Sequence, residues 1–100
     1  MSRDEVLTVL QRYREELTAR GVESLSLVGS VAREESAPDS DVDVVMKLTD
    51  RDRGFAHFRR LDELQERLSE ILGCRVDLIE EAAVSSRMQR EINRDRVLAF

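Results

Sequence analysis

The sequence predicts an α/β (α+β) fold in which helices flank a small three-stranded sheet, in the order α-β-α-β-α-β-α. Two long segments, 3–19 and 55–72, carry apolar residues at steps of three and four positions, which is the spacing of one helix face. Three short apolar segments have the length of strands and are bounded by glycines or polar turns. Because strands alternate with helices, we expect the helices to pack as a layer on the sheet.

Length and composition fit one globular domain, and we assign residues 1–100 to it. Apolar residues make up 41% and charged residues 37%, which indicates a globular protein with a heavily charged surface. The formal net charge of −5 argues against general nucleic-acid binding, because such binding depends on basic groups that neutralise phosphates.

The sequence carries no signal for a membrane or for an oxidising compartment. No apolar run reaches the roughly 18 residues that a membrane span needs. Asp4 and Glu5 stand where a targeting segment would be basic. Cys74 is the single cysteine, so an intramolecular disulfide is excluded. We therefore expect a cytoplasmic protein without a membrane contact.

The first expected helix covers residues 3–19. Ser2 precedes it and Glu5 follows three positions later, which is the pattern of a capping box. Gly21 lies just beyond the helix and is expected to end it in the left-handed conformation. We expect this helix to cover the sheet and to take no part in chemistry.

The first expected strand, Val22–Val28, ends at Gly29 and is followed by a short helix over residues 30–35. The first amides of this helix would point back over Gly29, and unpaired amides at a helix start attract phosphate. A lone Gly29-Ser30 pair is more often an ordinary turn. The aspartates that follow favour the phosphate site.

The second expected strand, residues 41–48, opens with two aspartates. Side chains alternate along a strand, so Asp41 and Asp43 point to the same side. Two carboxylates this close repel each other unless a cation lies between them, and Mg²⁺ suits such oxygen ligands. The alternative is that both are solvated residues at a strand start, although aspartate is disfavoured in strands.

The second long helix is expected over residues 55–72, with Phe55 and Phe58 on its apolar face and Gly73 at its end. Thr49 or Asp52 is the expected cap. His57, the single histidine, is interpreted as a surface or packing residue.

The last part of the chain is expected to form a strand, Cys74–Ile79, and a helix over residues 80–95. Asp77 lies in the middle of the strand, where a carboxylate is costly unless it faces a polar site. The apolar tail at residues 97–100 packs either on the sheet or against another chain; both alternatives stay open.

The motif residues resemble the signature of the DNA polymerase beta-like nucleotidyltransferase superfamily. Gly29-Ser30 is followed by Ser40-Asp41-Val42-Asp43, with Asp41 twelve positions after Gly29. The Gly-Ser-Val-Ala-Arg start and the chain length are most similar to the minimal nucleotidyltransferases, small proteins often paired with HEPN-domain toxins. Asp77 falls where that family places its third carboxylate. The resemblance spans roughly residues 25–79.

This resemblance implies a small mixed three-stranded sheet with the three carboxylates at one edge. It also implies transfer of a nucleoside monophosphate, AMP from ATP, to a hydroxyl group of a HEPN toxin, such as that of a tyrosine side chain. The chain would then be the antitoxin. Asp41 and Asp43 would then bind two Mg²⁺ ions, and Asp77 would bind the ion nearest the acceptor.

The same resemblance assigns four residues to nucleotide binding. Gly29 and Ser30 would hold the β- and γ-phosphates, and Arg33 and Ser40 would complete the nucleotide site. For Arg33 an alternative is that it pairs with neighbouring acids and shapes the loop.

One departure from the family pattern favours a second hypothesis. The residue after Arg33 is often glycine in the family and is Glu34 here, which would be strained if the position needs a positive φ. The competing hypothesis is a binding module that neutralises its partner by complex formation. Transfer to a small molecule such as an antibiotic hydroxyl is a third hypothesis, and a homo- or hetero-oligomer is compatible with each.

Overall fold

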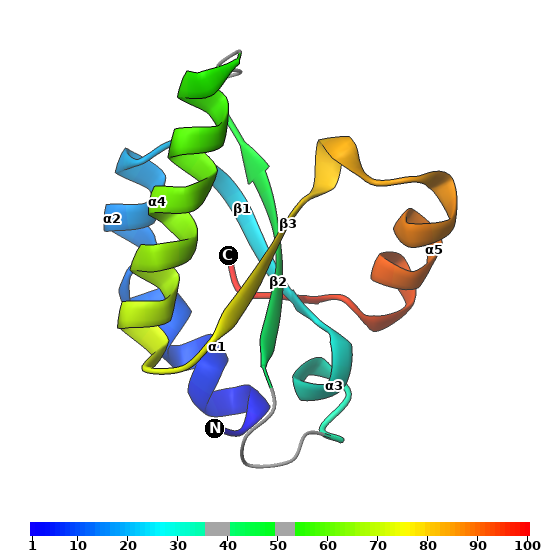
Figure 1. Ribbon diagram of the computed structural model, residues 1–100. Helices are drawn as coiled ribbons and strands as arrows, with labels where there is room; N and C mark the ends of the chain where they lie inside the picture. The colour runs from blue at the N-terminus through cyan, green and yellow to red at the C-terminus, as the bar shows by residue number, and fades with distance from the viewer. Residues whose placement is uncertain (36–40, 50–53) are drawn as a thin grey trace.

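The computed structural model describes residues 1–35, 41–49 and 54–100. In this part of the chain four strands form one sheet in the order β3-β2-β1-β4 (Figure 1). Their bounds are β1 Val22–Val28, β2 Val42–Leu48, β3 Val76–Glu80 and β4 Val97–Leu98. β1 is antiparallel to β2 and β4, whereas β2 and β3 are parallel. The expected mixed sheet is confirmed, with one strand more than predicted.

Helices cover both faces of this sheet. The helices α1, α2 and α4 lie on one face and α5 on the other (Figure 1). The main core lies under α1, α2 and α4 and includes these buried side chains: Val6, Leu10, Leu17, Leu25, Leu27, Val44, Met46, Leu64, Leu68 and Val76. A smaller cluster under α5 is built on Val28, Val45 and Ile92. Among the described residues, no helix is both long and apolar enough to cross a membrane.

The predicted first helix is divided in two, α1 Arg3–Arg12 and α2 Arg14–Ala19. The backbone leaves the helical conformation at Tyr13, while Leu10 and Leu17 remain fully buried on either side of the break. Each short helix therefore keeps the apolar face that the sequence predicts. The capping box is confirmed, because the Glu5 amide donates to Ser2 Oγ at 3.2 Å and the Ser2 amide to Glu5 Oε1 at 3.3 Å.

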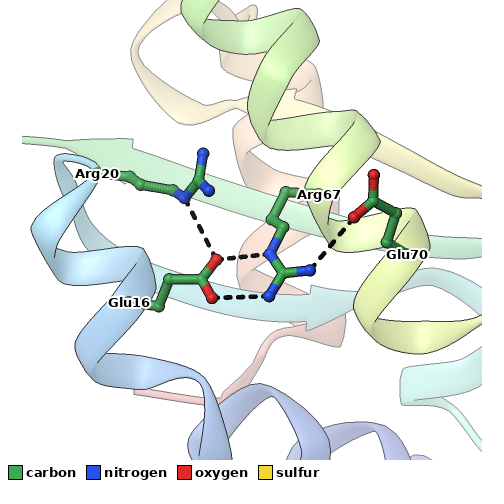
Figure 2. A network of polar contacts seen from close by, with 4 residues as sticks. All are labelled: Glu16, Arg20, Arg67 and Glu70. Carbon is green, nitrogen blue, oxygen red and sulfur yellow. Dashed lines mark hydrogen bonds and ion pairs between the residues drawn. The ribbon is translucent and has the colours of Figure 1, made fainter.

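Four charged side chains join α2 to α4, and Figure 2 shows them. Arg67 of α4 donates two hydrogen bonds to the carboxylate of Glu16, at 2.6 and 2.7 Å, and a third to Glu70 at 3.2 Å. Arg20 lies 3.2 Å from the same Glu16 carboxylate. The hydrogen bonds from Arg67 lower the pKa of Glu16. The Arg67 guanidinium also lies 5.4 Å from the centre of the Tyr13 ring.

Helix α4, Phe55–Leu72, has the predicted bounds and ends at Gly73 in the left-handed conformation. Its N-cap is Gly54, without a side-chain cap bond, so the prediction of Thr49 is wrong; Asp52 lies outside the described residues. The placement of Phe55 and Phe58 on the buried face is also wrong, because they are 90% and 65% exposed. The first turn of α4 extends past the end of the sheet (Figure 1).

The predicted helix over residues 80–95 begins later than expected. Residues Glu81–Ala83 form a 3₁₀ turn, and α5 covers Ser86–Asp95. Ser85 sets this start, because its Oγ accepts a hydrogen bond from the Met88 amide at 3.1 Å and so caps the helix. A strong cap inside the predicted segment therefore divided it.

The apolar tail packs on the sheet, which decides between the two alternatives for its placement. Strand β4 pairs with β1 at the sheet edge. The Ala99 amide donates to the Leu25 carbonyl at 2.8 Å, and the Leu25 amide donates to the Phe100 carbonyl at 3.1 Å. Ala99 is buried in the main core.

Candidate functional site

The predicted site residues meet where β1 ends and where β2 and β3 begin. Val28 lies opposite Asp43 in the antiparallel pair, and Asp43 lies opposite Asp77 in the parallel pair. On both strands the flanking valines and leucine belong to the main core, so Asp43 and Asp77 point to the α5 face. The sheet register thus places Gly29, Asp43 and Asp77 side by side.

Asp43 and Asp77 are neighbouring carboxyl groups on paired strands. Burial raises the pKa of Asp43, and the charge of Asp77 and its hydrogen bond to Asp43 raise it further. The charge of Asp41 acts in the same direction, while Arg33 opposes it. Two carboxylates in this position favour a shared proton or a cation between them. Their oxygen ligands suit Mg²⁺.

Asp41 stands apart from this pair. It precedes β2, its side chain is 40% exposed, and its Oδ2 lies 3.8 Å from Arg75 Nε. In the described ranges of the chain, no three His, Cys, Asp or Glu side chains form a group that could hold a metal ion. The structure therefore brings Asp43 and Asp77 together, and the three-carboxylate metal site stays a prediction.

Gly29 begins the short helix α3, Gly29–Ala32, and its backbone conformation and close neighbour both favour glycine. Its φ is +75°, a conformation that side chains rarely adopt. A Cβ at this position would overlap Oδ2 of Asp43 and lie 3.3 Å from its Cγ. The glycine therefore lets β1 pass close to the carboxylate. Ser30 lies next to it in the first turn of α3.

Helix α3 ends in a Schellman motif centred on Glu34. The Glu35 amide donates to the Ser30 carbonyl at 2.9 Å, and the Glu34 amide to the Val31 carbonyl at 3.1 Å. Glu34 has φ +61° and is the one described residue other than glycine with a positive φ. The sequence hypothesis about this position is therefore confirmed: it needs a positive φ, and a glutamate occupies it.

Arg33 is held by two carboxylates. Its Nε donates to Glu35 Oε2 at 3.0 Å, and its Nη1 donates to Asp95 Oδ2 at 2.8 Å. The first contact was among the expected local pairs, whereas Asp95 is 62 positions away in the sequence. The predicted site residue Ser40 lies outside the described residues.

A pocket of about 280 Å³ opens between this end of the sheet and α5. Gly29, Arg33 and Asp43 line one part of it. The remaining lining residues are Val28, Ile79, Met88, Glu91, Ile92 and Asp95. The pocket therefore has a polar part beside apolar walls.

Sequence reasoning missed the part of this pocket that α5 contributes. Met88, Glu91, Ile92 and Asp95 follow the three- and four-residue steps of one helix face. Met88 and Ile92 are four positions apart and so lie on one apolar face of the helix, and the same steps continue to Asp95 and place a carboxylate on that face. A carboxylate on an apolar helix face was the feature of the sequence that could have indicated the contribution of α5 to the pocket.

A larger hollow of about 500 Å³ lies at the other end of the sheet and holds none of the predicted site residues. Arg20, Gly21, Thr49 and Arg60 are among its lining residues.

His57, on the same helix as Arg60, lies 2.7 Å from Glu80 with 22% of its side chain exposed, which agrees with a packing role.

Known proteins resemble this chain over most of its length. Residues 10–99 match the family described as nucleotidyltransferase domain. The protein adenylyltransferase MntA of Thermococcus cleftensis is 30% identical over 95 residues, which cover 94% of this chain and 92% of that protein.

Solved structures share the fold. A provisionally assigned minimal nucleotidyltransferase superposes with a TM-score of 0.79 at 24% identity and covers 97% of this chain and 95% of that chain. A chain of the complex between the tri-AMPylated HEPN toxin of Shewanella oneidensis and MNT antitoxin superposes with a TM-score of 0.64 at 16% identity, covering 94% of this chain and 71% of that chain.

Proposed function

Because the chain belongs to the nucleotidyltransferase domain family, we propose that it transfers AMP from ATP to a hydroxyl group of a partner protein. The observation that supports this most is the junction of Gly29, Asp43 and Asp77 at one end of the sheet. It combines a close backbone approach with a carboxylate pair that favours a cation. Phosphate transfer needs both features.

Asp43 and Asp77 would hold Mg²⁺, with Asp41 as a further ligand. Their all-oxygen character suits this ion. Burial, and then the charge of Asp77, raise the pKa of Asp43, and a bound cation would compensate both effects. The contact of Asp41 with Arg75 is long and exposed, so it is weak enough to exchange. Two bound Mg²⁺ ions would neutralise the charge that develops on the phosphates and on the attacking oxygen.

The nucleotide would lie in the pocket between the sheet and α5. The amides of Gly29 and Ser30 and the guanidinium of Arg33 would bind phosphate oxygens, and Ser40 is proposed to complete this part. The base would contact the apolar walls formed by Val28 and Ile79.

In the reaction, the acceptor oxygen forms a bond to the α-phosphorus while the bond from that phosphorus to the oxygen bridging to the β-phosphate breaks. Pyrophosphate leaves. Asp77 would help to remove the proton of the acceptor hydroxyl. The chain acts mainly by holding acceptor and phosphate in line and by compensating charge.

The proposed acceptor is a hydroxyl, such as a tyrosine, of a HEPN-domain toxin, so that the chain serves as its antitoxin in the cytoplasm. The fold shared with a chain of the HEPN–MNT complex supports this choice. The second candidate function is a binding module that neutralises the toxin without transfer. The observation that favours the binding module is the unfavourable φ of +61° at Glu34, close in sequence to the proposed phosphate-binding residues Gly29 and Ser30.

The experiment that separates the two functions uses Asp77→Asn. Wild type and variant are incubated with labelled ATP, Mg²⁺ and the candidate HEPN partner, and label on the partner is followed by mass spectrometry. We expect the variant to bind ATP nearly as wild type does but to lose transfer by on the order of a hundredfold or more. Asp62→Asn, an exposed aspartate on α4, is the matched control and should transfer normally.

Two outcomes would change this assignment. Transfer by Asp77→Asn at the wild-type rate would confirm an enzyme but contradict the catalytic role of Asp77. Absence of transfer by either protein, together with tight complex formation and growth rescue by both, would establish the binding module instead.

A further inference from the structure

We propose that Asp95, the last residue of α5, is a positioning residue that holds Arg33 toward the phosphates of the nucleotide. The inference rests on the proposed function and adds to it a residue outside the motif. Asp95 Oδ2 accepts a hydrogen bond from Arg33 Nη1 at 2.8 Å, and both side chains line the pocket that also contains Gly29 and Asp43.

The guanidinium of Arg33 is held on two sides. Nε donates to Glu35 and Nη1 donates to Asp95, whereas Nη2 makes no hydrogen bond to the residues that the structure describes. Two anchors restrict the rotation of the side chain, and the remaining donor group stays available for a ligand. A guanidinium held in this way loses less conformational entropy when it binds phosphate.

Asp95 is placed for this purpose on the apolar face of α5. Its side chain is 13% exposed and follows Ile92 on the face that packs against the sheet. A carboxylate that is largely removed from water needs a strong partner, and Arg33 provides it. Its other neighbour, Arg94, is exposed and lies at 3.7 Å.

A second ion pair of α5 shows what a purely structural role looks like. Arg96 pairs with Glu81, whose side chain is 11% exposed, at the same end of the helix. Neither residue lines the pocket. The two pairs are therefore matched in burial and differ in whether they border the proposed nucleotide site.

The charge of Arg33 reaches the carboxylates as well. It opposes the effect of burial and of Asp77 on the pKa of Asp43. Arg33 and Asp43 also line the same pocket, so a phosphate bound there would lie near both the guanidinium and a cation held by Asp43. Asp95 would thus hold the guanidinium of Arg33 beside the reacting phosphate, as a positive group in addition to the two proposed Mg²⁺ ions.

The test measures ATP binding and transfer separately. Calorimetric titration of ATP with Mg²⁺ is performed on wild type and on the variants Asp95→Ala, Asp95→Asn and Arg33→Ala, and kcat and KM are then determined with the HEPN partner. We expect Asp95→Ala to weaken ATP binding and raise KM about tenfold with a smaller change in kcat. Asp95→Asn keeps an acceptor oxygen and should lose less. Glu81→Gln, the matched control, should lower the melting temperature without changing ATP affinity.

A double variant makes the assignment specific to Arg33. If Asp95 acts through this arginine, Arg33→Ala with Asp95→Ala binds ATP no worse than Arg33→Ala alone. Additive losses would overturn the proposal, and so would Asp95→Asn and Asp95→Ala that bind ATP like wild type. Failure of wild type to bind ATP would overturn the proposed function and this inference with it, whereas ATP binding without transfer would contradict the function alone.

Discussion

Glu34 occupies a backbone conformation that glycine adopts without strain. A side chain in the left-handed region costs about 1 kcal/mol, and Glu34 recovers part of this through an ion pair with Arg3 at 3.3 Å. We predict that Glu34→Gly is more stable than Glu34→Ala by about 1 kcal/mol, roughly 4–8 °C in Tm. Both variants lack the ion pair with Arg3, so the difference in Tm between them measures the cost of the backbone conformation alone. Equal melting temperatures would show that a side chain at position 34 causes no backbone strain.

Gly29 is constrained by its backbone and by its neighbour. Gly29→Ala must adopt a positive φ and also displace the Asp43 carboxylate, whereas a Cβ at Gly73 meets nothing within 4 Å. We predict that Gly29→Ala destabilises the protein more than Gly73→Ala, by about 1–3 kcal/mol, because both share the φ cost and only the first is overpacked. Denaturant unfolding of the two variants measures this difference. A similar loss in both would show that Asp43 moves aside freely.

Asp43 carries a charge that the fold disfavours. Its pKa is raised, so over the pH interval between the ordinary and the raised value the folded chain binds a proton that the unfolded chain releases. Stability therefore falls as the pH rises through this interval, and above it the ionised Asp43 remains a cost.

The corresponding variant is Asp43→Asn. In the presence of a chelator at neutral pH, we predict a higher Tm than for wild type and a smaller fall of Tm with rising pH. The same change should remove most Mg²⁺-dependent ATP affinity. Thermal melts from pH 3 to 8 and calorimetric titration test both effects, with Asp62→Asn as the control. A Tm below that of wild type at neutral pH would contradict the assigned repulsion.

At the scale of elements, α2 is tied to α4 by the Glu16–Arg67 pair. The two hydrogen bonds are parallel, a geometry that arginine provides and lysine does not. We predict that Arg67→Lys, like Arg67→Met, has a lower Tm than wild type, and that 1 M NaCl narrows the difference because salt screens partly exposed charges. Arg87→Lys, an exposed residue of α5 with a 3.8 Å contact to Glu91, should melt as wild type does. Full recovery by lysine would rule out the role of the paired bonds.

The elements that could be predicted from the sequence are those whose limits are set locally. Strand β1 and helix α4 end at Gly29 and Gly73, each in a positive φ, and both bounds were predicted. The start of α5 was missed because a serine cap decided it. Strand β4 has two residues, too few for a periodic pattern, and its place depends on the edge of β1.

The candidate site divides in the same way. Asp43 and Asp77 were found because they interrupt apolar strands and because strand alternation fixes their direction. The pairing of Arg33 with Asp95 could not be found, since local acids were equally good partners by sequence and the choice was made by the packing of α5. Asp41 is separate from the pair because β2 begins only at Val42, which leaves Asp41 before the strand.

At the scale of the whole molecule, the two faces of the sheet are packed unequally. The face under α1, α2 and α4 holds the main core, whereas α5 rests on the cluster around Val28, Val45 and Ile92. Ion pairs at Asp95 and Arg96 supplement this small apolar area. Helix α5 is therefore expected to open at a lower free energy than the rest of the fold, and the proposed nucleotide pocket lies on that more easily opened face.

The pairing of β4 with β1 also has a kinetic side. The hydrogen bonds of Leu25 with Ala99 and Phe100 join segments that are far apart in the sequence, so they close a long loop of unfolded chain. Such closures are entropically unfavourable and slow, whereas β1 and β2 are much nearer neighbours along the chain. We expect β4 to dock after the central strands have paired. Weakening the β4–β1 pairing would then increase the unfolding rate more than it decreases the folding rate. The lifetime of the native state therefore depends on the two residues of β4, Val97 and Leu98, more than the folding rate does.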